Sequence, residues 1–242
     1  MRDEDWPSFP PGYAARLCLE NAFETACRAA AQDNAEDGLL LWVDRQDRCE
    51  AAVVLRPLDT IDVALTLSYV GILGLHDGLA AVAPAETPAS IDWPDRLLVN
   101  EACVGGIRVA HGPLVEKQGM SDVPDWLVIG IAVQMTGSAE DDAPGVELEY
   151  TNLAEEGCGE VAVPKLVEAF SRHMLLWLDR WQEEGIEPVR RAVLHNLRDK
   201  QLNIEPNGDA WRQDGATKTW RGLREALRRP SWVLPEPVGS AS

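Results

Sequence analysis

The chain has 242 residues, of which 45% are hydrophobic, and its formal net charge at pH 7 is −18. This length suffices for one sizeable hydrophobic core and a small second module, and the negative charge argues against an extended basic surface for DNA or RNA. The five cysteines and four histidines lack the spacing of a disulfide framework or a metal site, so we expect neither.

The chain shows no sign of export or membrane insertion. Its first residues, Met1 to Pro7, lack the basic and apolar regions of a signal peptide. No uninterrupted run of about eighteen apolar residues occurs, as a membrane-spanning helix would need. We therefore expect a cytoplasmic protein without membrane contact, whose partners are small molecules or other proteins.

Hydrophobic periodicity predicts alternating helices and strands in the first part of the chain. Small and apolar residues at helical spacing indicate a helix near the N-terminus. A second helix begins at Asp59 or Thr60, either of which can cap it, and ends before Pro84. The expected strands cover residues 38–43, 50–55, 96–99, 103–109 and 126–135.

The second part of the chain is expected to be helical and then β-rich. Residues 136–148 are acidic with little to bury, which predicts a mobile loop. Pro164 can open a long helix, and a further helix packs beside it. The sequence Asn207-Gly208-Asp209 then predicts a hairpin between short strands.

These elements predict an α+β protein with two domains. A mixed sheet flanked by helices forms the larger domain, residues 1–198, and a small β-rich module forms residues 199–242. The acidic and basic residues after position 202 nearly balance, so almost all of the negative charge belongs to the larger domain.

Two adjacent motifs are the most informative part of the sequence. The stretch Asp92-Trp93-Pro94-Asp95-Arg96-Leu97-Leu98-Val99-Asn100 is followed at once by Cys103-Val104-Gly105-Gly106-Ile107-Arg108-Val109. A Trp-Pro dipeptide, a strand, a short turn and a Gly-Gly-Ile strand in this order resemble the corresponding segment of biotin protein ligases. The predicted strand that holds Gly130 resembles the next ligase strand, whose first glycine it keeps.

The resemblance extends over essentially the whole chain. Short motifs near both ends, Pro10-Pro11-Gly12-Tyr13 and Pro230-Ser231-Trp232 among them, are similar to bacterial proteins called biotin/lipoate protein ligase-like, which end in a domain of unknown function. The resemblance implies the class II synthetase and biotin ligase fold. It also implies a pocket for a small carboxylic acid such as biotin, lipoate or octanoate.

By the same resemblance, ATP and magnesium would serve as cofactors, and the protein would form an acyl-adenylate for transfer to an acyl or biotinyl carrier protein. Positive charge from lysine, arginine and magnesium stabilises the transition states of such reactions. Ligases of this kind form dimers, so edge strands would support a homodimer here.

This chain departs from the ligase pattern where the cations should stand. Residues 44–48 correspond to the Gly-Arg-Gly-Arg loop of biotin ligases and contain no glycine. Asp92 replaces the lysine before Trp-Pro, and Cys103 matches the lysine of the following strand. We therefore expect unmodified ligase chemistry to be lost unless Arg96 or Arg108 supplies the cation.

The resulting hypothesis assigns catalytic roles to Asp92, Arg96 and Arg108, although Asp92 also fits a plain turn residue. Glycines permit the close approach of a ligand or of a neighbouring strand, and Trp93 fits a pocket wall or the core. The expected ligand-binding residues are Trp93, Asp95, Gly105, Gly106 and Gly130.

Two other functions are open. Cys158 precedes a glycine, as does the cysteine of lipoyl and octanoyl transferases, and would support acyl transfer without ATP, although the adjacent Glu155 and Glu156 should weaken the thiolate. Otherwise Cys158 is an inert loop thiol. Alternatively, the protein is a non-catalytic binder of an acid, a nucleotide or a carrier.

A basic set near the C-terminus bears on carrier binding. Arg221, Arg224 and Arg228 would share one face of a helix over residues 220–229. That face would either dock an acidic carrier domain or remain solvated.

Overall fold

The structure is a computed structural model that describes residues 6–137 and 150–232. Its centre is a seven-stranded mixed sheet in the order β1-β2-β3-β9-β6-β5-β4. Only β1 and β2 pair in parallel, and the other neighbours are antiparallel. The strands are β1 (Ala14–Cys18), β2 (Leu39–Val43), β3 (Arg48–Leu55), β4 (Ala89–Asp92), β5 (Arg96–Val99), β6 (Ala102–His111) and β9 (Leu127–Gln134).

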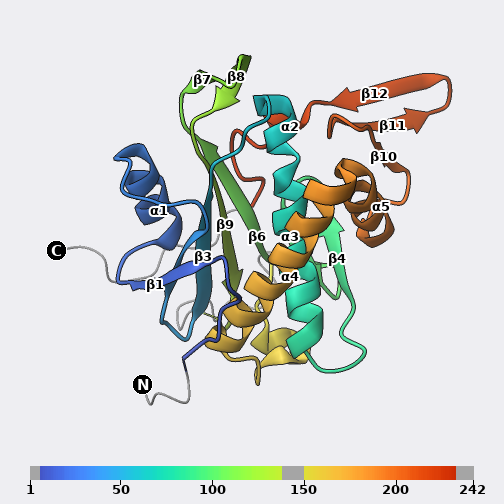
Figure 1. The fold of residues 1–242 in the computed structure, drawn as a ribbon. Coiled ribbons are helices and arrows are strands. Elements are labelled where there is room, and N and C mark those ends of the chain that lie inside the picture. Colours follow the sequence, from blue (N-terminus) through green and yellow to red (C-terminus); the bar gives the residue numbers. More distant parts are fainter. Residues whose placement is uncertain (1–5, 138–149, 233–242) are drawn as a thin grey trace.

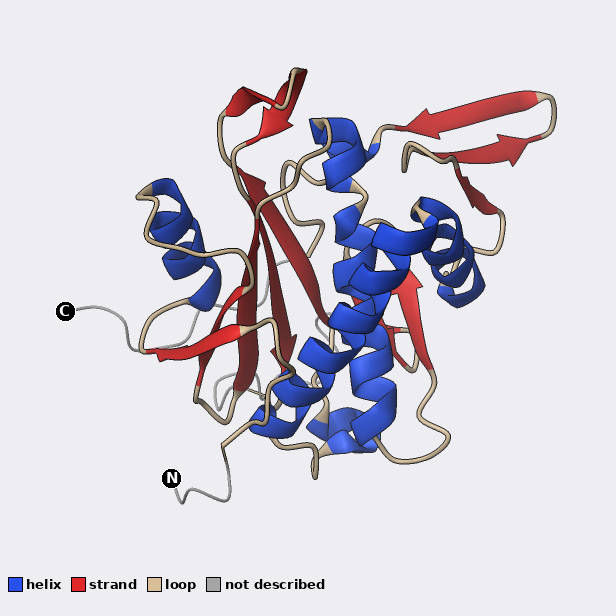
Figure 2. Ribbon diagram, viewed as in Figure 1, coloured by secondary structure: helices blue, strands red, loops and turns tan. Residues whose placement is uncertain are grey.

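Helices cover both faces of this sheet unequally (Figures 1 and 2). Four of them pack on one face, where the larger hydrophobic core lies. They are α2 (Ile61–Leu65), α3 (Leu67–Val82), α4 (Val163–Glu184) and α5 (Ile186–Asn196), and a π-helical turn, η2 (Ala154–Cys158), precedes α4. The stretch Ile61–Val82 is long and apolar enough to span a membrane, but 83% of its apolar window is buried inside the fold, as expected of a core helix.

The opposite face carries α1 (Ala22–Ala31), which packs on β2, β3 and β9. Its N-terminus is capped by the Asn21 side chain, which accepts a hydrogen bond from the backbone N–H of Glu24 at 3.0 Å. Three alanines, Ala22, Ala26 and Ala30, face the sheet and let the helix lie close to it. We call this face of the sheet the α1 face.

Two smaller β structures stand apart from the main sheet. One is the ribbon of β7 (Leu114–Lys117) and β8 (Met120–Pro124). The other is the C-terminal module, which consists of β10 (Leu202–Ile204), β11 (Ala210–Asp214), β12 (Thr217–Arg221) and α6 (Leu223–Ala226). The β11–β12 hairpin projects from the body of the protein, and the chain after it turns back toward the main sheet (Figure 1).

The predicted fold class, a mixed sheet flanked by helices with a small β-rich C-terminal part, is confirmed. The predicted acidic loop lies almost entirely outside the described residues. The helix considered over residues 220–229 is shorter, because β12 continues through Arg221 and α6 ends at Ala226. Arg221, Arg224 and Arg228 therefore do not share one helical face.

Candidate functional site

The Trp-Pro and Gly-Gly motifs form three neighbouring strands, β4, β5 and β6. Arg96 pairs with Gly106 and Leu97 with Gly105, after which the register shifts. Gly105 has a φ of 148°, and a Cβ on it would lie 2.1 Å from the Ala132 carbonyl oxygen. Glycine is therefore required at this position by the packing of β6 against β9.

One row of residues crosses the sheet on the α1 face. Glu50 of β3 pairs with Ala132 of β9, Ala132 pairs with Gly106 of β6, and Gly106 pairs with Arg96 of β5. Ala132 and Gly106, at the middle positions, carry almost no side chain. We call these two residues the floor, and it lies between the Glu50 carboxylate and the Arg96 guanidinium. With about 4.8 Å between strands, the floor separates the backbones of Arg96 and Glu50 by ~14 Å.

Charged groups gather at the β3 end of this row. The guanidinium of Arg45 donates to Asp47, with Nε 2.7 Å from Oδ1, and Arg48 Nη1 donates to Glu50 Oε1 at 3.4 Å. The hydrogen bond from Arg45 lowers the pKa of Asp47. Both Arg48 and Glu50 are buried, so this is a desolvated ion pair whose geometry the fold fixes.

Beside the floor, Arg108 of β6 lies over α1. Its guanidinium carbon is 5.1 Å from the centroid of the Phe23 ring. Gly130 pairs with Arg108, and a Cβ on Gly130 would lie 2.5 Å from Phe23 Cδ2. Gly130 thus allows the Phe23 ring to pack on the sheet next to Arg108.

The C-terminal segment occupies the other end of the row. The backbone N–H of Ser231 donates to Asp95 Oδ2 at 2.8 Å, and the Ser231 hydroxyl donates to the other carboxylate oxygen. Arg96 Nε donates to the Ser231 carbonyl oxygen at 3.0 Å. The Trp232 indole donates to the Ile107 carbonyl oxygen at 3.1 Å and covers Gly106.

The remaining predicted residues lie outside this face or at its edge. Asp92 pairs with Arg96 in register, and its Oδ2 is 3.8 Å from Arg96 Nη1 and 3.9 Å from Arg198 Nη2. Trp93 belongs to the core on the side of α3, where its Nε1 donates to Tyr69 Oη at 2.8 Å. Arg96, Gly106, Arg108 and Gly130 therefore share one face, whereas Trp93 does not.

The two cysteines discussed from the sequence are both buried. Cys158 lies in the core cluster beneath α3 and α4, with Sγ 3.8 Å from Thr87 Oγ1, and does not share the α1 face with Arg96 and Arg108. Cys103 lies under Trp232, and its Sγ donates to the Gly105 carbonyl oxygen at 3.4 Å.

Four residues of the α1 face were not predicted as site residues: Arg45, Arg48, Glu50 and Gln134. The loop at 44–48 lacks the expected glycines but does contain two arginines, and that was the available signal. Glu50 and Gln134 join the site only through strand register, as partners of Ala132 and Arg48. The side-chain oxygen of Gln134 is buried and has no hydrogen-bond partner among residues 6–137 and 150–232.

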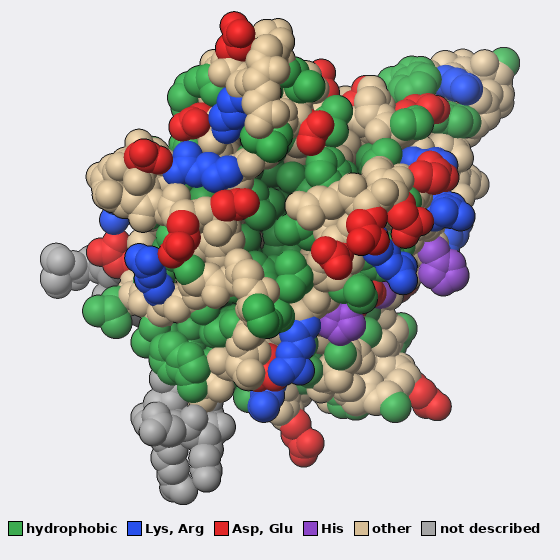
Figure 3. Space-filling model, viewed as in Figure 1, with side chains coloured by type: hydrophobic (Ala, Val, Ile, Leu, Met, Phe, Trp, Pro, Cys, Tyr) green, Lys and Arg blue, Asp and Glu red, His purple; other side chains and the backbone are tan. Residues whose placement is uncertain are grey.

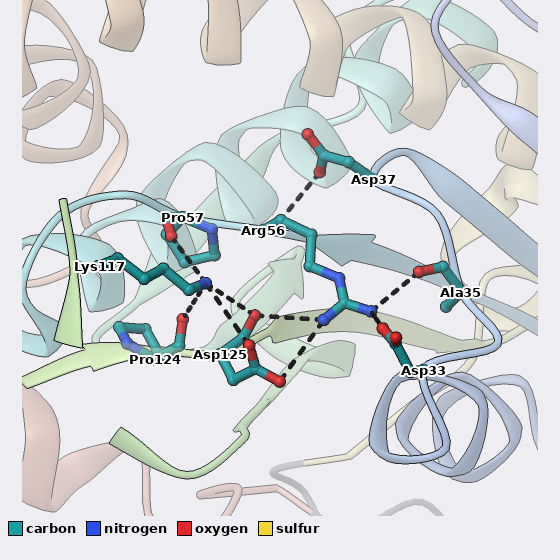
Figure 4. Close-up of polar contacts among 8 residues, drawn as sticks. All are labelled: Asp33, Ala35, Asp37, Arg56, Pro57, Lys117, Pro124 and Asp125. Carbon is teal, nitrogen blue, oxygen red and sulfur yellow. Dashed lines mark hydrogen bonds and ion pairs between the residues drawn. The ribbon is translucent and has the colours of Figure 1, made fainter. Parts of the chain in front are cut away.

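A separate hollow of about 680 Å³ with mostly hydrophobic walls lies on the side of the molecule that carries α2, α3 and α4 (Figure 3). It is bordered by Arg56, whose guanidinium holds Asp33 and Asp125, while Lys117 donates to the carbonyl oxygens of Pro124 and Asp125 (Figure 4). These contacts tie the end of β3 to the β7–β8 ribbon.

In the described ranges, no three His, Cys, Asp or Glu side chains gather as a metal site.

Comparisons with known proteins agree on one family. Residues 9–195 match the model of the biotin/lipoate A/B protein ligase family. Over 158 residues the chain is 28% identical to the biotin–acetyl-CoA-carboxylase ligase of Paracoccus denitrificans; the match covers 63% of this chain and 62% of that protein.

Solved structures show the same fold. A biotin protein ligase-like protein of unknown function from a Silicibacter species has a TM-score of 0.80 and 25% identity, covering 92% of this chain and 100% of that one. The biotin protein ligase of Aquifex aeolicus, in complex with biotin and ATP, has a TM-score of 0.64 and 15% identity, covering 86% and 95%.

Proposed function

This chain belongs to the biotin/lipoate A/B protein ligase family, and from that premise we propose that it binds biotin or a related small carboxylic acid together with ATP on the α1 face. The observation that carries the proposal is the row across the sheet, in which a floor of Ala132 and Gly106 lies between charged residues of β3 and β5. Arg108 adds a further cation beside this floor.

The chemistry of these residues fits two anionic ligands. Guanidinium groups bind carboxylates and phosphates through paired N–H donors, and they keep their charge at any physiological pH. Arg108 is proposed to hold a phosphate or the carboxylate, and Arg45 with Arg48 to hold the other anion. Magnesium, when bound with ATP, would neutralise part of the phosphate charge.

The proposed activity is acid and nucleotide binding. Transfer of the acid to a carrier, such as the carboxylase in the name of the Paracoccus relative, needs further positive charge at the reacting groups. At the β4 end of the row, Asp92 is opposed by Arg96 and Arg198, so its carboxylate offsets the cations there. Cys158 belongs to the hydrophobic core on the other side of the sheet, away from the cations of this face.

Isothermal titration tests the proposal with biotin, lipoate and octanoate, each with and without ATP and magnesium. We expect one acid to bind, and to bind more tightly with ATP. Arg108→Gln should weaken ATP-dependent binding about tenfold or more, as loss of a charged hydrogen bond does. Arg16→Gln is the matched control, because the Arg16 side chain is 60% exposed on β1 and pairs only with Glu36 among the described residues.

Two results would contradict the proposal. One is the absence of binding for every acid and for ATP. The other is equal binding by wild type and Arg108→Gln, which would remove Arg108 from the site.

A further inference from the structure

We propose that Asp95, Arg96 and Ile107 form a binding site for the chain's own segment Pro230–Trp232, and that this segment competes with the ligand of the α1 face. We call residues 230–232 the strap. The inference rests on the proposed function for the identity of the ligand. The contacts of the strap are independent of it.

The strap is recognised through both its backbone and its side chains. Asp95 accepts hydrogen bonds from the N–H and the hydroxyl of Ser231, and Arg96 donates to the Ser231 carbonyl oxygen. The indole N–H of Trp232 donates to the Ile107 carbonyl oxygen. Each of these donors and acceptors has a partner supplied by β5, by β6 or by the turn into β5, as in a specific peptide site.

Burial shows that the site formed by Asp95, Arg96 and Ile107 fits the strap closely. Asp95 is 1% exposed and Trp232 is 3% exposed. A buried carboxylate is costly without donors, and Ser231 supplies two of them. A Cβ on Gly106 would lie 2.0 Å from the Asp95 carbonyl oxygen and 2.5 Å from the indole nitrogen, so glycine leaves room for both the Asp95 backbone and this ring.

The strap uses groups that a ligand on this face would also need. It covers Gly106 and engages Arg96, the cation at the β5 end of the row. A ligand that lies on the floor beside Gly106, or that binds Arg96, therefore has to displace Trp232 or Ser231. The apparent dissociation constant then equals the intrinsic one divided by the fraction of molecules in which the strap is open.

Hydrogen exchange at Ser231 measures the position of the strap directly. In the free protein its amide should be protected by the Asp95 carboxylate, and a saturating acid with ATP and magnesium should raise its exchange rate. In the 242-residue chain, Trp232→Ala should bind the acid at least about tenfold more tightly than wild type. Trp220→Ala is the control, since Trp220 is 54% exposed on β12 and should leave the affinity unchanged.

Asp95→Asn provides a second variant of the same shape if Trp232→Ala does not fold, and its effect should have the same direction. Ligand binding with unchanged protection at Ser231 overturns the strap and leaves the proposed function standing. Equal or weaker binding by the strap variants also overturns it. If wild type and variants bind none of the acids and no ATP, the proposed function fails, and competition by the strap fails with it.

Discussion

The buried side chain of Asp95 should make the stability of the protein depend on pH. Burial raises its pKa, and the hydrogen bonds from Ser231 offset only part of that rise. An acid whose pKa is higher in the folded state stabilises the fold most below its unfolded pKa of about 4, and loses this contribution as the pH rises through the folded value.

We therefore expect the stability of wild type relative to Asp95→Asn to decrease as the pH rises. The amide of the variant does not titrate, so the difference in unfolding free energy isolates this carboxyl group. Urea unfolding of both proteins at a series of pH values from about 4 to about 8, which begins at the unfolded pKa, measures that difference. A difference that grows in favour of wild type as the pH rises would show that the hydrogen bonds outweigh burial.

At single positions, the sequence shows that a close approach occurs but not what approaches. The pair Gly105 and Gly106 predicts that another group of the protein or a ligand approaches the backbone closely. The structure places the Ala132 carbonyl at the first, and the Asp95 carbonyl together with the Trp232 indole at the second. Trp232 is 125 residues from its hydrogen-bond partner Ile107, and no local pattern encodes a contact of that separation.

Among the elements, those with a strong hydrophobic pattern were predicted and those without one were not. β3 and β9 are buried along their whole length, and their apolar runs mark them in the sequence. β1 is an edge strand without a fully buried residue, and most of β8 is exposed. Such strands form because a neighbouring strand supplies hydrogen-bond partners, which a single-chain pattern does not record.

The packing of α3 on α4 depends on glycine. A Cβ on Gly74 would lie 2.8 Å from the Cα and 2.9 Å from the backbone nitrogen of Met174. Gly74→Ala therefore has to push the two helices apart, and backbone atoms cannot rotate away as a side chain does. We expect a loss of about 2 kcal/mol in unfolding free energy, even though alanine favours a helix by about 1 kcal/mol.

Gly159→Ala is the matched control for this prediction. Gly159 has ordinary helical dihedral angles, and a Cβ there would lie 3.7 Å from Ala154, which is normal contact. Denaturant unfolding should show little change for this variant. A loss for Gly74→Ala as small as that for Gly159→Ala would mean that the helix pair tolerates the added methyl group.

For the whole molecule, the sequence predicted a main α+β part and a β-rich C-terminal part, but not how the two are connected. The C-terminal strands begin at Leu202, close to the predicted boundary at 198. Ser231 and Trp232 nevertheless pack on the main sheet, so the end of the described chain belongs structurally to the larger part. The strap and the hydroxyl of Tyr69 are two separate links between the parts.

The Tyr69 link permits a sharp test of how strongly the C-terminal module is held. Tyr69 is fully buried, and its hydroxyl donates to the Gly208 carbonyl oxygen at 2.5 Å while it accepts from Trp93 Nε1 at 2.8 Å. Tyr69→Phe leaves both partners buried without their hydrogen bond, at a cost of about 1–3 kcal/mol each. We expect the variant to have a lower unfolding free energy than wild type. Its hydrogen exchange should accelerate more in β10 and β11 than in β3 and β9.

The same substitution at Tyr13 supplies the control. The Tyr13 hydroxyl is also buried, but it has no hydrogen-bond partner in the part of the chain that the structure describes. Tyr13→Phe removes an unsatisfied polar group and should be neutral or slightly stabilising in urea unfolding. If Tyr69→Phe behaved like Tyr13→Phe, with no change in exchange at β10 and β11, the C-terminal module would be held by its apolar contacts and the strap rather than by this hydroxyl. Opposite effects of the two changes would instead trace the attachment to one hydrogen-bonded oxygen.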